Sequence, residues 1–189
     1  MSLHADALGT LRSWPAPDDT QAALRDRFVT HLETNEDGVF RGCVPDHVTA
    51  SALVLSDDLS QVLLTLHAKA QRWFQFGGHL EPGDATLLAA ATREAAEESG
   101  LAGLVLDPVP VQLSEHAVPF CGGTVLPGGR SVRHLDVRFV AVAPAGAAFA
   151  VSDESLDVRW WPADELPDPQ PDLIDLVALA RRRLDLRSR

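Results

Sequence analysis

Three glutamates stand close together near the middle of the chain, at a spacing that could bind a metal ion. Glu94, Glu97 and Glu98 occupy positions i, i+3 and i+4. In a helix these positions project from one side, so the sequence predicts a cluster of three carboxylates. Arg93 could brace Glu97, and a divalent cation would relieve the remaining repulsion. Oxygen ligands in an incomplete set suit Mg²⁺ or Mn²⁺, which also bind substrate phosphates. The alternative is a solvated helix face with an ordinary ion pair.

The residues around the three acids predict the helix and the loop that position them. Asp84 is an N-cap candidate after the turn at Pro82 and Gly83, so we expect the helix to begin at about Ala85. Ser99 followed by Gly100 supplies a stop signal. Upstream, two glycines at 77 and 78 allow the backbone to approach a ligand closely, and a carbonyl there is a plausible metal ligand.

Residues 78–101 resemble the signature of Nudix hydrolases, which is G, five residues, E, seven residues, then R-E-U-x-E-E-x-G-U with U aliphatic. The chain has Gly78, Asp84, and then Arg93-Glu94-Ala95-x-Glu97-Glu98-x-Gly100-Leu101. It departs from the pattern in two ways: the first acid is Asp84, and eight residues instead of seven separate it from Arg93. We expect the extra residue to be absorbed in the loop or in the first helical turn. The resemblance implies an α/β fold, a Nudix-type α/β/α sandwich with a mixed β-sheet.

The resemblance also implies a reaction, the metal-dependent hydrolysis of a pyrophosphate bond in a nucleoside diphosphate linked to another moiety. Mg²⁺ or Mn²⁺ would be held by Glu94, Glu97 and Glu98, the three glutamates of this signature (the Nudix box), and by a carbonyl of Gly77 or Gly78. Arg93 would orient the acids. The water's proton would pass to Glu97 or Glu98, or to Glu154 in a loop before a later strand.

Two other functions stay open from the sequence. A Nudix-fold module could bind a nucleotide or regulate without cleaving it. An isomerase of isoprenoid diphosphates shares the fold but needs a catalytic cysteine, and neither Cys43 nor Cys121 lies in a context that suggests one.

Four residues outside the acid cluster are candidates for contacts with the nucleotide. Arg72, in the aromatic segment 69–76, could reach a phosphate or be a surface charge, and His79 follows the glycine pair. Alternation in residues 131–142 places His134 and Asp136 on one face with Arg138, which predicts either a lined cleft or a solvent-facing sheet surface. A zinc site from His116, His134, Asp136 and Cys121 is a further alternative, although no compact ligand spacing supports it.

The remaining pattern predicts the elements that carry these residues. Strands are expected at residues 48–55 and 61–67, as a hairpin, and at 109–118, 131–142 and 156–161. Helices are expected at 21–34, capped by Thr20, and at 172–186. We therefore divide the chain into an N-terminal helical extension, 1–46, packed on the main body, and a Nudix domain, 47–189.

Composition excludes several classes of protein. The chain has 189 residues and a net charge of −11, which argues against a nucleic acid polymer as a partner but not against a metal-bridged small phosphate. It lacks a signal peptide pattern and any apolar run of the roughly 18 residues that a membrane span needs, so we expect a cytoplasmic protein. Two cysteines are too few for a disulfide framework. The sequence does not decide between a monomer and a homodimer, and no feature of it supports dimerisation.

Overall fold

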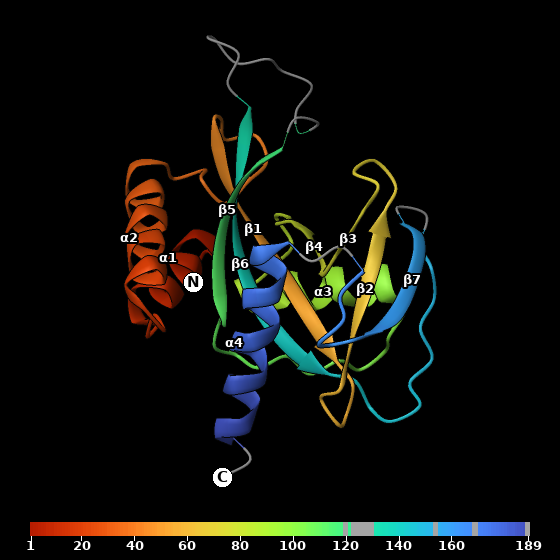
Figure 1. The fold of residues 1–189 in the computed structure, drawn as a ribbon. Coiled ribbons are helices and arrows are strands. Elements are labelled where there is room, and N and C mark those ends of the chain that lie inside the picture. Colours follow the sequence, from red (N-terminus) through yellow and green to blue (C-terminus); the bar gives the residue numbers. More distant parts are fainter. Residues whose placement is uncertain (119–120, 122–130, 153–154, 168–169, 188–189) are drawn as a thin grey trace.

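A seven-stranded mixed sheet forms the centre of the structure, a computed structural model that describes residues 1–118, 121, 131–152, 155–167 and 170–187 (Figure 1). The strand order is β3-β2-β1-β6-β5, with β4 paired to β1 and β7 paired to β2. β1 and β6 are parallel and the other pairs are antiparallel. The strands are β1 (Asp46–Leu55), β2 (Gln61–His67), β3 (Arg72–Phe74), β4 (Phe76–His79), β5 (Gln112–Val118), β6 (Val132–Val142) and β7 (Ser155–Pro162). The helices are α1 (Leu3–Ser13), α2 (Asp19–Thr34), α3 (Leu87–Ser99) and α4 (Pro171–Arg187).

β1 is the middle strand of this order, and all ten of its residues are buried. Its alternate side chains enter two different cores. Val48 and Val54 belong to a core shared with α1, α2 and α3, whereas Leu53 and Leu55 belong to a second core shared with α4. In Figure 1, α4 lies in front of the sheet and α3 behind it. The expected α/β/α sandwich with a mixed sheet is therefore confirmed.

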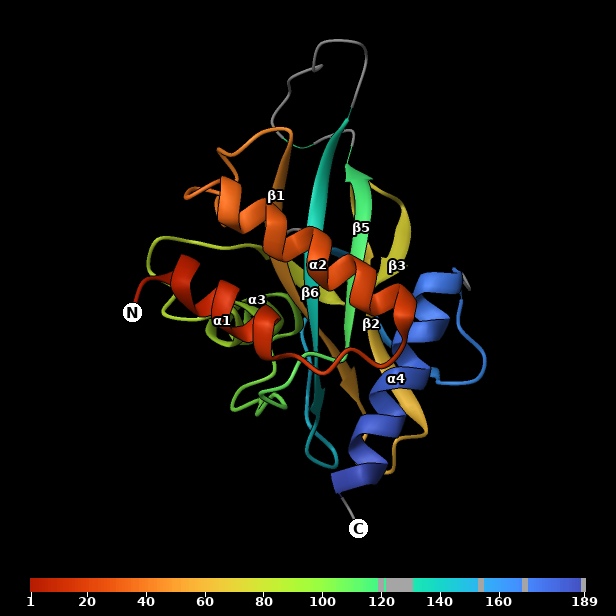
Figure 2. The ribbon, with the colours of Figure 1, turned by 90° about the vertical axis from the view of Figure 1, so that its left-hand side faces the viewer.

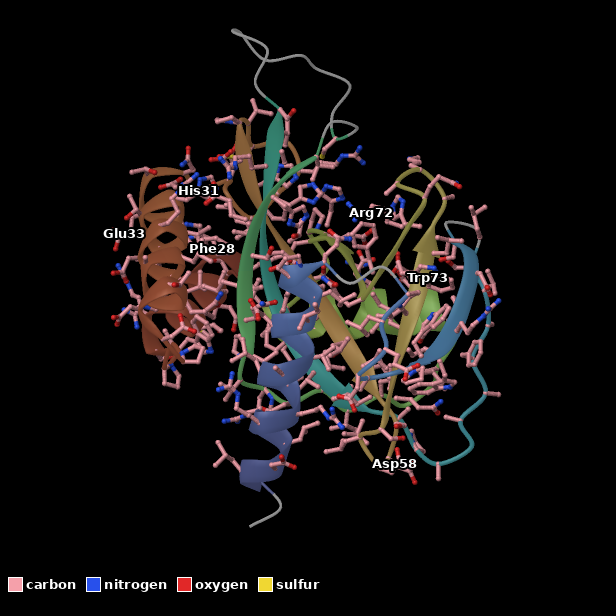
Figure 3. All side chains as sticks on the ribbon, viewed as in Figure 1. Phe28, His31, Glu33, Asp58, Arg72 and Trp73 are labelled. Carbon is pink, nitrogen blue, oxygen red and sulfur yellow. The ribbon has the colours of Figure 1, made fainter. Side chains whose placement is uncertain are left out.

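α2 packs against β5 at the edge of the sheet, and α1 packs against α2 and α3 (Figure 2). The side-chain amide of Gln21 replaces a neighbouring strand, since it accepts from the Leu113 amide at 2.7 Å and donates to the Leu113 carbonyl at 3.0 Å. The Trp14 indole donates to the Pro110 carbonyl at 2.6 Å. In Figure 3, Phe28 points from α2 toward the sheet and Glu33 lies on the outer side. The two helices thus satisfy backbone groups that an uncovered edge strand would leave unpaired.

We expect Gln21→Leu to lower the free energy of unfolding by about 2 kcal/mol, because the buried N–H and C=O groups of Leu113 lose their hydrogen bonds to the Gln21 side chain. Urea unfolding followed by circular dichroism measures this. Gln61→Leu, at an exposed position, is the matched control and should change stability by less than about 0.5 kcal/mol. Equal stability of both variants would show that water replaces the Gln21 amide.

The observed elements differ from the expected ones mainly near the N-terminus. Helix α1 was not expected, and α2 begins at Asp19 because the Asp18 side chain, not Thr20, accepts from the Gln21 amide. Residues 69–76, in which no strand was expected, contain β3 and the start of β4. The hairpin of β1 and β2 is present, paired at Val54 and Leu55. None of the helices in the described ranges is long and apolar enough to cross a membrane.

Candidate active site

Helix α3 carries the three glutamates and begins two residues later than the sequence suggested. Its N-cap is Thr86, whose hydroxyl accepts from the Ala89 amide at 3.0 Å, so the expectation of an Asp84 cap was wrong. Asp84 has other partners, the Glu81 amide at 2.8 Å and the Arg93 guanidinium. The helix ends at Gly100, whose φ of 69° is left-handed, as the stop signal predicts.

Arg93 joins the loop to the acid cluster. Its guanidinium binds Asp84 in a bidentate manner at 3.1 and 3.0 Å, and it donates to the His79 carbonyl at 3.1 Å. One of its nitrogens also donates to Glu94 at 3.0 Å and to Glu97 at 3.1 Å. The hydrogen bonds to Asp84 hold the pKa of Arg93 above its ordinary value. The extra residue between Asp84 and Arg93 therefore leaves the pairing of the two side chains intact.

The two glycines of β4 contact two of the three glutamates, Gly77 at Glu98 and Gly78 at Glu94. The Gly77 amide donates to Glu98 at 3.1 Å, and Glu98 is only 9% exposed. A Cβ atom at Gly78 would lie 2.8 Å from a carboxylate oxygen of Glu94, so this carboxylate rests directly on the glycine backbone. Glu97 is the most exposed of the three, with 61% of its side chain accessible. The three acids and the glycine loop therefore form one site.

This donor set fits a hard divalent cation. Glu94 and Glu97 share one nitrogen of Arg93, and the backbone of the glycine loop adjoins Glu94 and Glu98. Oxygen donors of this kind suit Mg²⁺ or Mn²⁺. The residues present thus fit the metal that the box implies.

Two of the candidates for contacts with substrate or water, Arg72 and Glu154, are not placed at this site by the described residues. Arg72 lies on the exposed side of the short strand β3 (Figure 3). The neighbouring Trp73 packs edge-on against Trp161, with ring centroids 5.2 Å apart. Glu154 lies outside the described residues. Contacts of Arg72 and Glu154 with substrate or water stay predictions.

Asp136 belongs to a buried polar network in the sheet. Thr49 and Ser51 on β1 donate to its carboxylate at 3.1 and 2.8 Å, and Arg138 donates at 2.9 Å. Arg138 also pairs with Asp172 of α4 at 2.7 Å. Burial works to raise the pKa of Asp136, but Arg138, His116 and the hydrogen bond from Ser51 together outweigh it, and the pKa lies below its ordinary value. The polar face of β6 is thus internal at this point, neither an open cleft wall nor a solvent-facing surface.

His79 and His134 meet in a second cluster together with His47 and Cys121. The ring centroids of His79 and His134 are 4.9 Å apart, and that of His47 lies 5.2 and 4.9 Å from them. The Cys121 sulfur is 3.4 Å from Nε2 of His79 and 3.6 Å from Nε2 of His47.

Sequence patterns suggested only half of this second cluster. His134 and Cys121 belong to the predicted zinc alternative, but His116 and Asp136 are not in the cluster, and His47 was not among the predicted ligands. The pairing that places His47 opposite His134 joins strands far apart in sequence, so no local signal indicates it. Burial lowers the pKa of His79 to about 4 and that of His134 to about 3, with the neighbouring imidazoles acting in the same direction.

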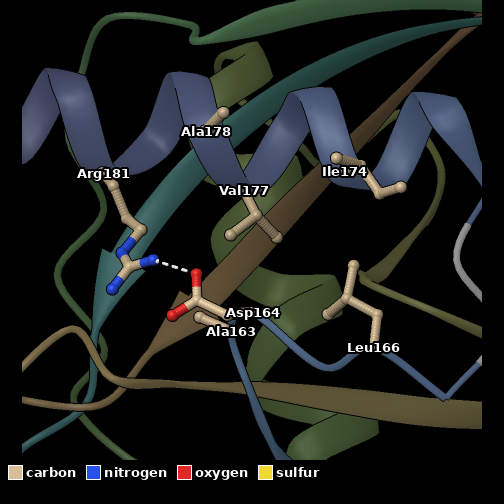
Figure 4. A pocket seen from close by; sticks show the side chains of 7 residues that line it. All are labelled: Ala163, Asp164, Leu166, Ile174, Val177, Ala178 and Arg181. Carbon is tan, nitrogen blue, oxygen red and sulfur yellow. Dashed lines mark hydrogen bonds and ion pairs between the residues drawn. The ribbon is translucent and has the colours of Figure 1, made fainter.

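A pocket of about 280 Å³ lies away from both clusters, between α4 and the turn after β7 (Figure 4). Aliphatic side chains line it, and the Arg181–Asp164 ion pair at 2.8 Å crosses it. It contains no residue of the box. The carboxylate chemistry therefore does not depend on this pocket.

We expect Arg93→Lys to raise the Mg²⁺ concentration that gives half-maximal activity by about tenfold. A lysine cannot reproduce the fork that holds Asp84, the His79 carbonyl and the glutamates at once, and loss of groups that orient metal ligands typically costs 10- to 100-fold in affinity. Magnesium titrations of activity measure the effect. Arg159→Lys, at an exposed ion pair with Asp157, is the control, and an unchanged magnesium dependence of Arg93→Lys would contradict the positioning role.

Comparison with known proteins identifies the class to which this site belongs. The NUDIX domain family model matches residues 45–180. The chain therefore belongs to the NUDIX family, and it is a hydrolase of that family. No curated protein matches the chain.

Solved structures of the same fold have low sequence identity to the chain. A NUDIX family hydrolase from Clostridium perfringens has 24% identity and a TM-score of 0.53, over 74% of this chain and 97% of that one. The NUDIX domain of Shewanella oneidensis NrtR, complexed with ADP ribose, has 23% identity and a TM-score of 0.55, over 72% and 87%. A C. elegans Ap4A hydrolase, in a binary complex, has 16% identity and a TM-score of 0.53, over 75% and 97%. At these identities the likeness concerns the fold.

Proposed function

We propose that the protein hydrolyses a pyrophosphate bond in a nucleoside diphosphate linked to another moiety, with Mg²⁺ or Mn²⁺ as cofactor. The observation that carries this proposal is the position of Arg93, which connects Asp84, Glu94 and Glu97 to the glycine loop through contacts of 3.0 to 3.1 Å. A cluster of carboxylates suits phosphate chemistry, because divalent cations that balance its negative charge also bind phosphate oxygens.

Each residue of the site has a separate role in this proposal. Glu94 and Glu98, held against Gly78 and Gly77, are fixed ligands for the cation. When bound, the ion supplies charge neutralisation at the phosphate and lowers the pKa of a water molecule. Glu97 is exposed and is the better placed glutamate to accept a proton from the attacking water. Arg93 orients the carboxylates and does not need to touch substrate.

The substrate class rests on the family and on two of its solved structures. The NrtR domain forms a complex with ADP ribose, and the C. elegans protein is an Ap4A hydrolase. Both molecules contain a diphosphate linkage between a nucleoside and a second group. A nucleotide-type small molecule is therefore our proposal for this chain as well, and the net charge of −11 disfavours a polyanion.

The non-catalytic alternative has less support once the box geometry is considered. Its main encouragement in the sequence was the extra residue before Arg93, which could have separated Asp84 from the helix. The bidentate contact between Asp84 and Arg93 is nevertheless present at 3.1 and 3.0 Å. The loop and helix halves of the box are therefore held together, which supports hydrolysis over binding alone.

A screen of nucleotide substrates tests the proposal. The purified full-length chain is incubated with ADP-ribose, dinucleoside polyphosphates, sugar nucleotides, oxidised nucleotides and coenzyme A, with Mg²⁺, with Mn²⁺ and without either ion. We expect ion-dependent cleavage of at least one compound into two phosphate-bearing products. Binding of a nucleotide by folded protein, with no cleavage under any of these conditions, would instead establish the non-catalytic module.

A further inference from the structure

The cluster of His47, His79, Cys121 and His134 has no role in the proposed hydrolysis. These residues come from β1, β4, β6 and the connection that precedes β6, so four separate parts of the chain converge. Their donor atoms all lie within 4.8 Å of one another. We propose that the four side chains bind one zinc ion in a closed, tetrahedral structural site.

The distances from the Cys121 sulfur to two of the histidines match those of a tetrahedral zinc site. Zinc binds sulfur at about 2.3 Å and imidazole nitrogen at about 2.0–2.1 Å, so a tetrahedral arrangement separates sulfur from nitrogen by about 3.6 Å. The Cys121 sulfur lies 3.6 Å from the His47 nitrogen and 3.4 Å from the His79 nitrogen. The donor atoms of all four side chains lie within 4.8 Å of one another, so one ion binds all of them once the remaining pairs move closer together.

The imidazoles have the orientation and environment that metal ligands need. Nδ1 of His47 lies 3.1 Å from the Cys43 carbonyl, which fixes it as a donor and leaves Nε2 as an acceptor facing Cys121. Nε2 of His134 is buried and has no hydrogen-bond partner in the described part of the chain. A buried polar atom without a partner is costly, and a metal ion would satisfy it.

The donor types distinguish this site from the acid cluster. Nitrogen and sulfur ligands suit zinc and not magnesium, and four protein ligands close the coordination sphere, as in structural zinc sites. His47 and Cys121 are only 1% and 5% exposed, so the ion would be shielded from solvent.

Zinc at this position would fix the loop that the hydrolase site uses. His79 supplies a proposed zinc ligand through its ring, while its carbonyl accepts from Arg93 at 3.1 Å. An ion that binds His79 together with His47 and His134 would connect the short strand β4 to β1 and β6. The zinc would therefore stabilise the glycine loop without taking part in the chemistry.

Metal analysis and cobalt substitution of the full-length protein test the proposal. We expect one zinc per chain after dialysis against a weak chelator, and a fall in melting temperature after stripping with a strong one, reversed by Zn²⁺ but not by Mg²⁺. Cobalt in the stripped protein should give the intense visible bands of tetrahedral coordination and a thiolate charge-transfer band in the near ultraviolet. These readouts require no hydrolase activity.

Cys121→Ser is the decisive variant and Cys43→Ser its matched control, since both cysteines are buried. Cys121→Ser should lose the charge-transfer band and bind zinc at least about 100-fold more weakly. Cys43→Ser should keep both properties, because only its carbonyl contacts the cluster. Glu98→Gln, in the acid cluster, should also keep the cobalt spectrum. A wild-type protein that binds no stoichiometric zinc, or a cobalt spectrum that Cys121→Ser leaves unchanged, would overturn the proposal.

Discussion

Replacing Glu98 with glutamine is expected to lower kcat by a factor of about 10³, the largest effect on activity of any change considered. Glu98 is 9% exposed and is held by the Gly77 amide at 3.1 Å, so its charge is fixed at the glycine loop where the cation is proposed to bind. Glutamine keeps the shape and the acceptor oxygen but removes the charge that attracts the ion. Losses of 10²- to 10⁴-fold are typical for single groups of this kind.

Steady-state kinetics on the substrate found by the screen, with the melting temperature measured in parallel, check this prediction. Glu81→Gln is the matched control, because Glu81 is an exposed carboxylate of the same loop and the structure gives it only a backbone contact to Asp84. Near-normal turnover of a folded Glu98→Gln variant would remove Glu98 from the proposed cation site.

The part of the site that was predictable from sequence is the part built from short-range contacts. Arg93, Glu94 and Glu97 are neighbours on one helix, so helical spacing alone indicates that they meet. The choice of N-cap was not settled by the same reasoning. Asp84 and Thr86 are both good caps, and Thr86 occupies the position because Asp84 is bound by Arg93 nine residues away.

The contacts between distant strands were not predictable in this way. The parallel pairing of β1 and β6 places His47 opposite His134 and Thr49 opposite Asp136. Alternation correctly placed His134 and Asp136 on one face of their strand, but it cannot indicate what covers that face. Asp172 of α4 pairs with the buried Arg138 on that face, and Cys121 lies beside the histidines.

Helix α1 was not predicted because its buried positions are few. Leu3, Ala7 and Leu11 are buried at a spacing of four residues, but alanine between the two leucines weakens the apolar pattern. Its docking depends on contacts with α2 and α3, among them the Asp6 carboxylate, which accepts from the Leu87 amide at 2.9 Å. That bond adds a partner to the first turn of the box helix, which a sequence pattern confined to residues 78–101 could not reveal.

The second large effect is expected from adding one methyl group to either glycine of β4. At Gly77 the protein should lose stability, and at Gly78 it should lose activity. A Cβ atom at Gly77 would lie 2.2 Å from Cβ and 2.6 Å from Cα of Ser51, so the two strand backbones would have to separate. We expect Gly77→Ala to lower the free energy of unfolding by at least about 3 kcal/mol, since backbone cannot yield as a side chain can. Urea unfolding measures this loss.

At Gly78 the atoms nearest to the same methyl group would be those of the Glu94 carboxylate, at 2.8 to 2.9 Å, the far end of a flexible side chain. Gly78→Ala should therefore fold with near-normal stability but displace a proposed metal ligand, lowering kcat/KM by about 10- to 100-fold. Gly83→Ala is the control for both, because its Cβ would meet nothing within 4 Å. If Gly78→Ala lost stability instead of activity, Glu94 would be a packing residue of the loop, and the cation site would have to be built from Glu97 and Glu98 without it.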